Sequence, residues 1–352
     1  MRRSADPRPH RLPRLSDVAA LAGVSVATAS LALNGQPVAE TTRERVLEAA
    51  AQLRYVARSH AKALKTGQTG VIGFWIVNRP GTVELTEDSG FFYRILRGAF
   101  TAAETHGFSI SFNVARADLA QVGEHLSAVA GRGLYDAVII AAQWANDGSY
   151  AGAVRARGVP VVTLNDPHEP GDANVRVDQE AGIRLAVDHL VANGHTDIAY
   201  LAGPAGHLDA DARLAAFYKA TAERGLRVPE RHVRRVDFTI EAGAAAFAAL
   251  LDGSRSFTAL LAADDFVAAG AIQTAHERGL RVPADVSVVG FDDVDVARAT
   301  TPPLTTVKMP MTEVGERAAT AAAALVRQDA TVASVVLAPS LVERASVTAP
   351  GG

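Results

Sequence analysis

Residues 17–35, DVAALAGVSVATASLALNG, place a few hydrogen-bonding side chains among alanines, valines and leucines. Apart from Asp17 at its start, these side chains are Ser25, Thr28, Ser30 and Asn34, and the stretch contains no lysine or arginine. Hydroxyl and amide groups form hydrogen bonds, but they lack the charged, planar fork with which a guanidinium makes its strongest contacts. The segment is therefore either part of a buried core or a surface that binds its partner through few hydrogen bonds and many methyl contacts.

Three short helices are expected to position these side chains. The first is predicted to start from a cap on Ser16 and to end at Gly23, which permits a tight turn. The second is predicted to start from a cap on Ser25 and to end before Gly35. A capping box that begins at Thr41 marks the third helix. The apolar positions of the first and third helices are Val18, Leu21, Ala22, Val46, Ala50 and Leu53.

The second helix has two chemically different faces. An advance of about 100° per residue puts Ala29, Ala32 and Leu33 on the face that packs on the first helix. The outward face, with Val26 beside it at the N-terminal end, consists of Ala27, Ser30, Leu31 and Asn34. Two helices joined by such a turn are typical of a helix-turn-helix, whose second helix places its outward face in the DNA major groove.

The distribution of charge favours a polyanionic partner for the N-terminal part of the chain. Residues 1–68 hold 11 of the 35 Lys and Arg residues and 5 of the 38 Asp and Glu residues, whereas the remainder is acidic. The alternative is that this asymmetry serves solubility alone. We expect a disordered basic arm over residues 1–13, a helix-turn-helix domain over 14–57 and a hinge helix or linker over 58–68.

Composition and missing motifs exclude several kinds of chemistry. The 352 residues include no cysteine, which excludes disulfides and thiolate catalysis. No apolar run reaches the roughly 18 residues of a membrane span, and no apolar signal segment follows the basic N-terminus. Phosphate-binding glycine loops, nucleophile elbows and metal-binding histidine spacings are absent from the sequence. We expect a cytoplasmic protein that is not an enzyme, with no catalytic residue, metal, cofactor or membrane partner.

From residue 70 onward, short apolar strands alternate with alanine-rich helical segments. The strand runs are VIGFWIV, AVIIAA, VPVVTL, IAYLAG, ALLAA and VSVVGF, and the helical segments include 92–106, 179–193 and 210–224. This alternation indicates doubly wound parallel sheets. Residues 69–350 are too many for one such domain, so we expect a two-lobed α/β core with a cleft at the strand ends. The first lobe is predicted to hold about 69–174 and 305–330, and the second about 175–304 and 331–350.

The N-terminal part contains a characteristic order of residues. Its members are Asp17-Val18-Ala19, Ala22-Gly23-Val24-Ser25, Thr28, Ser30, Asn34, Thr42-Arg43, Val46, Ala50, Leu53 and Tyr55. This order resembles that of LacI/GalR-type transcriptional repressors. In that family a hinge helix, at the position of about 58–66, forms on operator binding and inserts a leucine into the minor groove. The resemblance implies DNA contacts from Ser25, Val26, Ala27, Thr28, Ser30, Leu31, Asn34, Ala61, Leu64 and Lys65. Leu31 replaces the usual arginine of the family, so at that position only methyl or sugar contacts are available.

The resemblance extends over the rest of the chain, where the family has the periplasmic-binding-protein fold. The matching motifs are GFFYRILRGAF, VPVVTLND, DARLAAFYKA, VDFTIEAG, LLAADDFVAAG and VVGFDDVD. They imply an effector site built from Phe91, Phe92, Asn165, Arg213, Phe238, Asp264, Asp265 and Asp292, whereas Met309 replaces a frequent glutamine. Carboxylates accept hydroxyls, the guanidinium donates, and aromatic rings pack on sugar C–H groups. The alternatives are that the aspartates cap helices, that the arginine forms a surface ion pair, and that the phenylalanines belong to the core.

These observations together predict a homodimeric, DNA-binding transcriptional repressor. It would bind a pseudo-palindromic double-stranded operator, with an affinity controlled by a small-molecule effector that is a sugar or a sugar derivative. Two other functions remain open on the sequence: a nucleobase-responsive regulator, and a solute-binding protein without a regulatory role.

Overall fold

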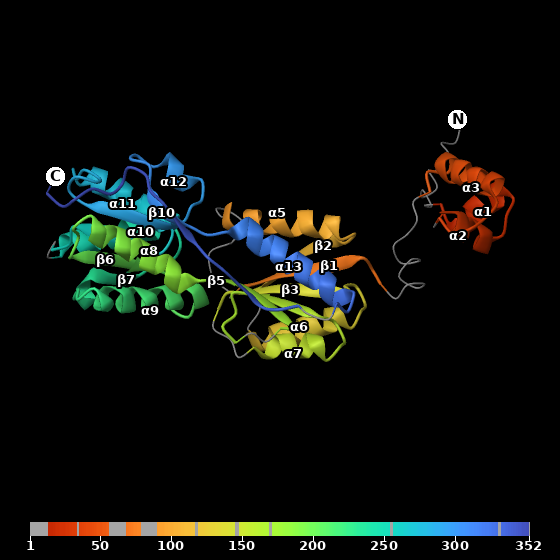
Figure 1. Ribbon diagram of the computed structural model, residues 1–352, viewed down its shortest axis with the longest axis horizontal. Helices are drawn as coiled ribbons and strands as arrows, with labels where there is room; N and C mark the ends of the chain where they lie inside the picture. Colours follow the sequence, from red (N-terminus) through yellow and green to blue (C-terminus); the bar gives the residue numbers. More distant parts are fainter. Residues whose placement is uncertain are drawn as a thin grey trace, which may run out of the picture. The chain divides into compact units, whose positions relative to one another are not determined.

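The computed structural model describes residues 13–33, 35–55, 68–78, 90–116, 119–144, 148–168, 171–253, 256–329 and 332–351. The chain divides into two compact units after Thr69 (Figure 1). We call the unit up to Thr69 the head and the unit from Gly70 onward the core. Residues 1–12 of the expected basic arm and residues 58–67 of the expected hinge lie outside the described residues.

The described residues of the head form α1 (Leu15–Ala22), α2 (Val26–Leu33) and α3 (Glu40–Gln52). Their shared apolar centre consists of Val18, Ala19, Ala22, Ala29, Ala32, Val46, Ala49 and Ala50. Because most of these side chains are small, three short helices can pack closely around them. Gly23 ends α1 with a φ of 65°, a left-handed conformation that glycine adopts without strain.

The starts of α1 and α2 depend on side-chain capping. The predicted cap on Ser16 is wrong, because α1 begins after Arg14 and the Asp17 carboxylate accepts the Arg14 N–H at 2.7 Å. The predicted cap of α2 is confirmed, since Ser25 Oγ accepts a hydrogen bond from the N–H of Thr28 at 3.0 Å.

The third helix begins after Ala39, so the predicted capping box at Thr41 is wrong and this threonine lies inside the helix. A carboxylate in the first turn, that of Glu40, instead faces the positive end of the helix dipole. Among the described residues, no single helix is long and apolar enough to cross a membrane. Helices α1 and α2 together are long and apolar enough, by length and composition only, but the pair is bent by 100° between them.

The first sheet of the core has the strand order β11-β5-β4-β3-β1-β2, and all of its neighbouring strands are parallel. Its strands are β1 (Val71–Asn78), β2 (Ser109–Arg116), β3 (Ala137–Ala142), β4 (Val161–Leu164), β5 (Ala173–Val177) and β11 (Val335–Leu337). Helices α5 (Gly90–Thr105) and α13 (Met311–Val326) cover one face, and α6 (Leu119–Ala130) and α7 (Ser149–Arg155) cover the other (Figure 1). We call this sheet with its four helices the first lobe.

The second sheet has the order β12-β10-β9-β8-β6-β7, in which only β12 is antiparallel to its neighbour. Its strands are β6 (Ile198–Ala202), β7 (Val233–Arg235), β8 (Ala259–Ala262), β9 (Ser287–Asp292), β10 (Thr305–Lys308) and β12 (Ser340–Val342). The helices of this second lobe are α8 (Gln179–Ala192), α9 (Leu208–Glu223), α10 (Ile240–Asp252), α11 (Asp265–Glu277) and α12 (Val296–Ala299), with a 3₁₀ turn at Glu230–His232. All six predicted strands are confirmed, and so are the three predicted helical segments.

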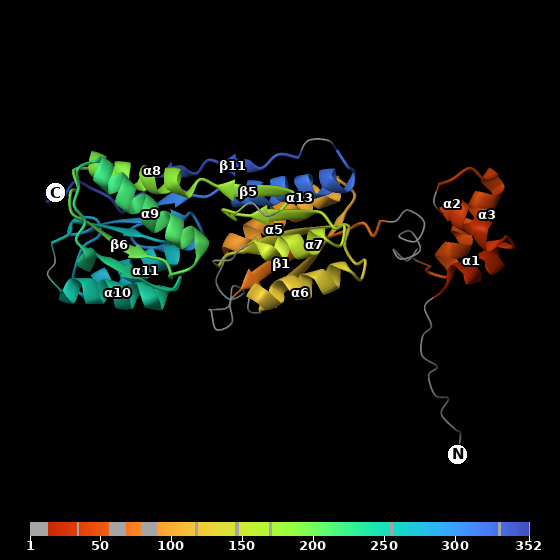
Figure 2. The same cartoon turned by 90° about the horizontal axis from the view of Figure 1, so that it is seen from below.

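The lobe boundaries differ from the expected ones in two places. The sequence places residues 305–308 in the first lobe, but β10 pairs with β9 in the second sheet. It places residues 335–337 in the second lobe, but β11 runs beside β5 in the first sheet (Figure 2). The partner strand decides the sheet to which a strand belongs, and a short apolar run does not specify its partner.

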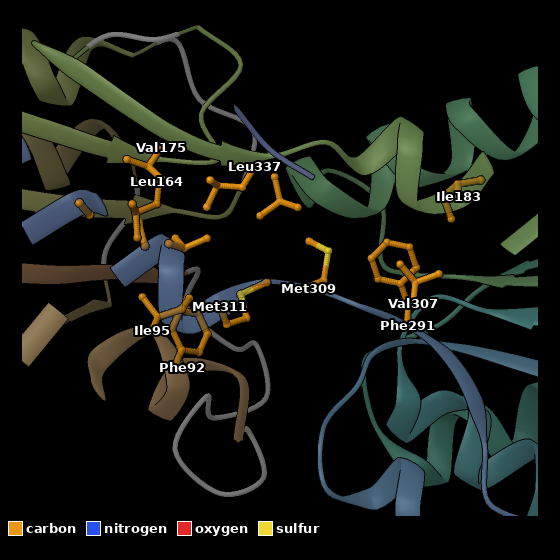
Figure 3. Packing of buried hydrophobic residues seen from close by; sticks show 14 of the residues in the cluster. Phe92, Ile95, Leu164, Val175, Ile183, Phe291, Val307, Met309, Met311 and Leu337 are labelled. Atoms are coloured by element: carbon orange, nitrogen blue, oxygen red, sulfur yellow. The ribbon is translucent and has the colours of Figure 1, made fainter. Parts of the chain in front are cut away.

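One apolar cluster continues from the first lobe into the second (Figure 3). Phe92 and Leu164 belong to the first lobe and Phe291 and Val307 to the second, with Met309 between them. Met309 is 2% exposed, so its side chain packs between the lobes at the position where the family often has glutamine.

Two glycines allow α5 and α13 to cross at very short range. A Cβ on Gly315 would lie 1.9 Å from the carbonyl oxygen of Ile95, and one on Gly98 would lie 2.0 Å from that of Thr312. Real Cβ atoms do not approach oxygen so closely, so the spacing of these two helices depends on glycine at both positions. This crossing fixes α5, whose first turn carries Phe91 and Phe92.

Candidate functional sites

The exposed side of α2 is the candidate interaction surface of the head. Ala29 and Ala32 are buried as predicted, whereas Val26 is 49% exposed and Leu31 is 38% exposed. Ala27 is also exposed and Ser30 is half-buried. The helix therefore presents methyl groups outward, which agrees with the two faces predicted from its sequence.

Ser25 and Thr28 already hydrogen-bond to each other, with 2.8 Å between their hydroxyl oxygens. Each hydroxyl retains further hydrogen-bonding capacity for a partner, because it has one donor and two acceptor positions. The remaining residues predicted to contact DNA, Asn34, Ala61, Leu64 and Lys65, lie outside the described residues.

The two lobes of the core are joined by hydrogen bonds at the carboxyl end of the first sheet. Asn165, which follows β4 with a φ of 50°, donates from Nδ2 to Oδ2 of Asp209 at 3.1 Å. The N–H of Leu208 donates to the carbonyl of Gln143, which follows β3, at 2.8 Å. The lobes are thus in contact where the first turn of α9 meets the ends of β3 and β4.

A cavity with an empty volume of about 370 Å³, its open mouth included, lies at this contact. Its wall is mostly apolar, with a polar edge, and includes Phe91, Phe92, Ile95, Ala141, Ala142, Gln143, Leu164, Asn165, Leu208, Asp209 and Val314. Three of the residues predicted to bind the effector, Phe91, Phe92 and Asn165, therefore line one cavity. Such a wall suits a ligand with both C–H surfaces and hydroxyl groups.

Arg213 is the centre of a buried hydrogen-bond network next to this contact. It is 3% exposed, so it is not the surface ion pair that the alternative interpretation offered. Its guanidinium donates to Gln179 Oε1 at 2.8 Å, to the Ala263 carbonyl at 2.6 Å and to Asp292 Oδ1 at 3.2 Å. It also lies 3.9 Å above the ring of Phe291, a distance typical of a cation–π contact.

The three predicted aspartates have different roles. Asp264 caps α11 by accepting the N–H of Val267 at 2.7 Å, and burial raises its pKa to about 7. Asp292, with a φ of 101°, has a raised pKa because burial outweighs the effect of Arg213. These two carboxylates are coupled, since Asp292 also raises the pKa of Asp264.

Asp265 differs from the prediction that it contacts the effector. It is fully buried, and its two oxygens accept hydrogen bonds from Thr306 Oγ1 at 2.5 Å and from the N–H of Val294 at 2.8 Å. Burial holds its pKa well above the usual range. Because both oxygens are used inside the protein, Asp265 ties α11 to β10 and to the turn after β9 instead of facing a ligand.

Phe238 forms part of an aromatic row between the lobes. Its ring lies 5.1 Å from that of His207, which lies 5.4 Å from that of Trp144 in the first lobe. Burial lowers the pKa of His207 to about 3, so this ring is neutral. Phe238 also covers Gly203, where a Cβ would lie 2.5 Å from the ring. In the described structure Phe238 supports the lobe contact and does not line the cavity.

Sequence reasoning missed Asp209, which lines the cavity from the first turn of α9. Its pKa is raised to about 6, mainly by burial; the charge of Arg213 lowers this pKa and that of Asp292 raises it. The available signal was its spacing, since Asp209 precedes Arg213 by one helical turn and so shares its face. Within the described part of the chain, no group of three or more His, Asp or Glu side chains is placed to hold a metal ion.

Comparison with known proteins matches both parts of the chain. A family model described as bacterial regulatory proteins, lacI family, matches residues 14–57, and one described as a periplasmic binding protein-like domain matches residues 187–347. The HTH-type transcriptional regulator GalR of Escherichia coli (strain K12) is 33% identical over 96% of either chain. This protein belongs to the lacI family.

Membership of the lacI family is supported along the whole chain. An uncharacterized HTH-type transcriptional regulator in the aml 5' region of Streptomyces limosus is 34% identical over 97% of either chain. The crystal structure of the lac repressor dimer bound to operator and the anti-inducer ONPF superposes with a TM-score of 0.86 at 30% identity, over 96% of this chain and 100% of that one. As a lacI-family member, the protein is a helix-turn-helix transcriptional regulator.

Proposed function

We propose that the protein is a homodimeric repressor whose affinity for a pseudo-palindromic operator is set by a sugar-like effector bound in the core. The observation that carries this proposal is the combination of an outward-facing α2 with a cavity where two lobes meet. An exposed helix can enter the major groove, and a ligand between lobes can select one lobe arrangement. A repressor of chromosomal genes acts in the cytoplasm, and none of these roles requires catalysis.

DNA reading by α2 would depend on methyl contacts and DNA shape more than on hydrogen bonds. Val26, Ala27 and Leu31 offer apolar groups, which can contact thymine methyls but cannot bond guanine bidentately. Lysines near the hinge would neutralise phosphates, and a leucine would enter the minor groove. The proposed DNA-binding set is Ser25, Val26, Ala27, Thr28, Ser30, Leu31, Asn34, Ala61, Leu64 and Lys65.

The effector would bind where Asn165 of the first lobe meets Asp209 of the second. Phe91 and Phe92 would pack against the C–H face of a sugar ring, and the carboxylates would accept its hydroxyls. A ligand that contacts both lobes has different affinities for the closed and open arrangements, which is the condition for control of a distant site. Arg213, Asp264 and Asp292 would shape the second-lobe side of this site.

The dimer is supported by an apolar surface on the first lobe. Tyr93 and Phe100 of α5 are 66% and 46% exposed, and Phe112 and Val114 of the neighbouring edge strand β2 are 40% and 36% exposed. Phe112 pairs in register with Phe74, whose side chain lies under α5, so these strand residues share the face of the sheet that α5 covers. A second copy of the chain packed on this surface would remove it from water.

Selection from a random DNA pool with the full-length protein tests this function. We expect enrichment of a two-fold symmetric sequence, and an affinity that falls by about 0.9 log unit per log unit of salt for each phosphate neutralised. A panel of sugars should contain one that changes the affinity for the enriched sequence. Failure to enrich any sequence, or an affinity independent of salt, would contradict the proposal.

A further inference from the structure

The lobes also meet where α5 faces the turn that follows β9. Arg94, near the start of α5, donates from Nη1 to the carbonyl oxygen of Asp293 at 2.6 Å and from Nη2 to Oδ1 of Asp295 at 3.0 Å. Helix α5 belongs to the first lobe and the turn belongs to the second. In the described structure, Arg94 is not among the residues that line the cavity. A role of Arg94 in ligand control would therefore act through the arrangement of the lobes and not through contact with the ligand.

The hydrogen bond to the backbone is the stronger half of this contact. The side chain of Arg94 is 21% exposed, whereas that of Asp295 is 92% exposed. An ion pair with so exposed a carboxylate contributes little, because water screens the two charges. A hydrogen bond from a guanidinium to the carbonyl oxygen of Asp293 is charge-assisted, and the burial of Arg94 shields it from water. We therefore expect Arg94 to hold the turn mainly by its backbone.

The turn that Arg94 contacts has an uncommon backbone conformation. Asp292 and Asp293 have φ values of 101° and 54°, which residues other than glycine rarely adopt. Such a backbone persists only where its surroundings hold it. Within the second lobe, the Asp293 carboxylate accepts a hydrogen bond from Arg344, and the next backbone N–H donates to Asp265. Arg94 adds a contact from the first lobe to the same turn.

Both sides of this contact are joined to the walls of the candidate effector site. Asp292, at the start of the turn, accepts a hydrogen bond from Arg213 at 3.2 Å. Phe91 and Phe92, which precede Arg94 on α5, line the cavity. A shift of the turn away from α5 would therefore move the Arg213 side of the site away from its aromatic side.

We propose that Arg94 is a positioning residue, which grips the turn after β9 and holds the two lobes together before a ligand binds. This inference rests on the proposed function, because it concerns the regulation of that same site. A ligand that contacts both lobes binds best to the arrangement in which the lobes are together. The population of that arrangement limits the apparent affinity, so Arg94 prepares the site for a ligand that it does not touch.

Trp144 supplies a native signal for separation of the lobes. Its ring lies 5.4 Å from that of His207 in the second lobe, whereas Trp75 is only 5% exposed within the first lobe. In the full-length protein without ligand, Arg94→Met should increase the quenching of tryptophan fluorescence by acrylamide by about twofold. The reason is that loss of a charge-assisted hydrogen bond shifts the equilibrium between the lobe arrangements by about tenfold or more. Asp295→Asn should increase the quenching far less, because that partner is exposed.

Arg97→Met is the matched control, because Arg97 lies on the same helix but donates to Thr312 Oγ1 at 3.1 Å within the first lobe. Its quenching should equal that of the unchanged protein. If Arg94→Met does not fold, Arg94→Lys, which keeps the charge but lacks the planar fork, should give a smaller increase. Unchanged quenching in a folded Arg94 variant, or an equal increase in the Arg97 variant, overturns the inference.

Operator binding separates this inference from the proposed function. If the lobe arrangement controls the head, Arg94→Met should raise or lower the affinity for the enriched operator by at least about threefold. Increased quenching with an unchanged operator affinity would support the positioning role of Arg94 but contradict control of the operator by the lobes. Failure to enrich any operator would contradict the proposed function, and the quenching would still decide the inference.

Discussion

Substitution of Arg213 by methionine tests the buried network of the second lobe. The change keeps an unbranched apolar stem but removes three hydrogen bonds and the cation above Phe291. Asp292, whose pKa is already raised by burial, then loses the main group that favours its ionised form. We expect Arg213→Met to abolish the response to the effector while operator binding is preserved.

The magnitude follows from the buried ion pair. Removal of one partner of such a pair leaves an uncompensated charge and typically costs about 3–5 kcal/mol in the free energy of unfolding. This loss of stability should depend on pH, because in the folded variant the pKa of Asp292 rises further above the pKa that this residue has in the unfolded chain. The folded variant then binds a proton more tightly than the unfolded chain, so its stability falls by up to about 1.4 kcal/mol per pH unit between those two pKa values. The loss should accordingly be larger at pH 8 than at pH 5.

Urea unfolding at the two pH values, followed by tryptophan fluorescence, measures this effect. The chain has two tryptophans, Trp75 and Trp144, and both lie in the core, so the signal reports the unit that contains the substitution. Asp292→Asn is the control, and in its background Arg213→Met should cost less and keep only the smaller pH dependence that arises from Asp209 and Asp264, whose pKa values Arg213 also lowers. Equal losses at pH 5 and pH 8, or equal losses in both backgrounds, would refute the reasoning.

Four further outcomes are expected. Leu31→Arg should shift the selected operator toward guanine at one base pair of each half-site by about 1–3 kcal/mol, and an unchanged selected sequence would contradict the proposed orientation of α2. Gly315→Ala should lower the stability of the core by about 1–3 kcal/mol in urea unfolding, because α5 and α13 must move apart to admit the new Cβ. The control is Gly152→Ala, which should not destabilise the core because nothing lies within 4 Å of its new Cβ. Phe100→Glu should produce monomers in sedimentation, and a retained dimer would exclude the α5 surface as the interface. Burial raises the pKa of Asp264 to about 7, so the folded protein binds this proton more tightly than the unfolded chain does. The free energy of unfolding should therefore fall as the pH rises from about 4 to 7. In thermal unfolding, Asp264→Asn should reduce that fall.

Local periodicity was sufficient to predict the three helices of the head and half of the strands described in the core, but not the contacts between elements. The two faces of α2 followed from the 3.6-residue repeat, and Ala29 and Ala32 are buried accordingly. Helix starts were less predictable, because the acceptor that begins α1 is the Asp17 carboxylate and not a hydroxyl at the cap position. The family resemblance indicated Asp265 as a ligand contact, but β10, 41 residues further on, supplies a partner that occupies one of its oxygens.

The sequence by itself determined the helical head and the alternation of strands and helices, whereas the resemblance to the family indicated Phe91, Phe92 and Asn165, which line the cavity. Those features depend on repeats of two to four residues and on side-chain chemistry that each segment carries alone. Only the tertiary structure decided which sheet takes β10 and β11, that Met309 packs between the lobes, and that Asp209 meets Asn165 across their contact. These are pairings between segments distant in the chain, and they depend on which surfaces are buried together when the whole core forms.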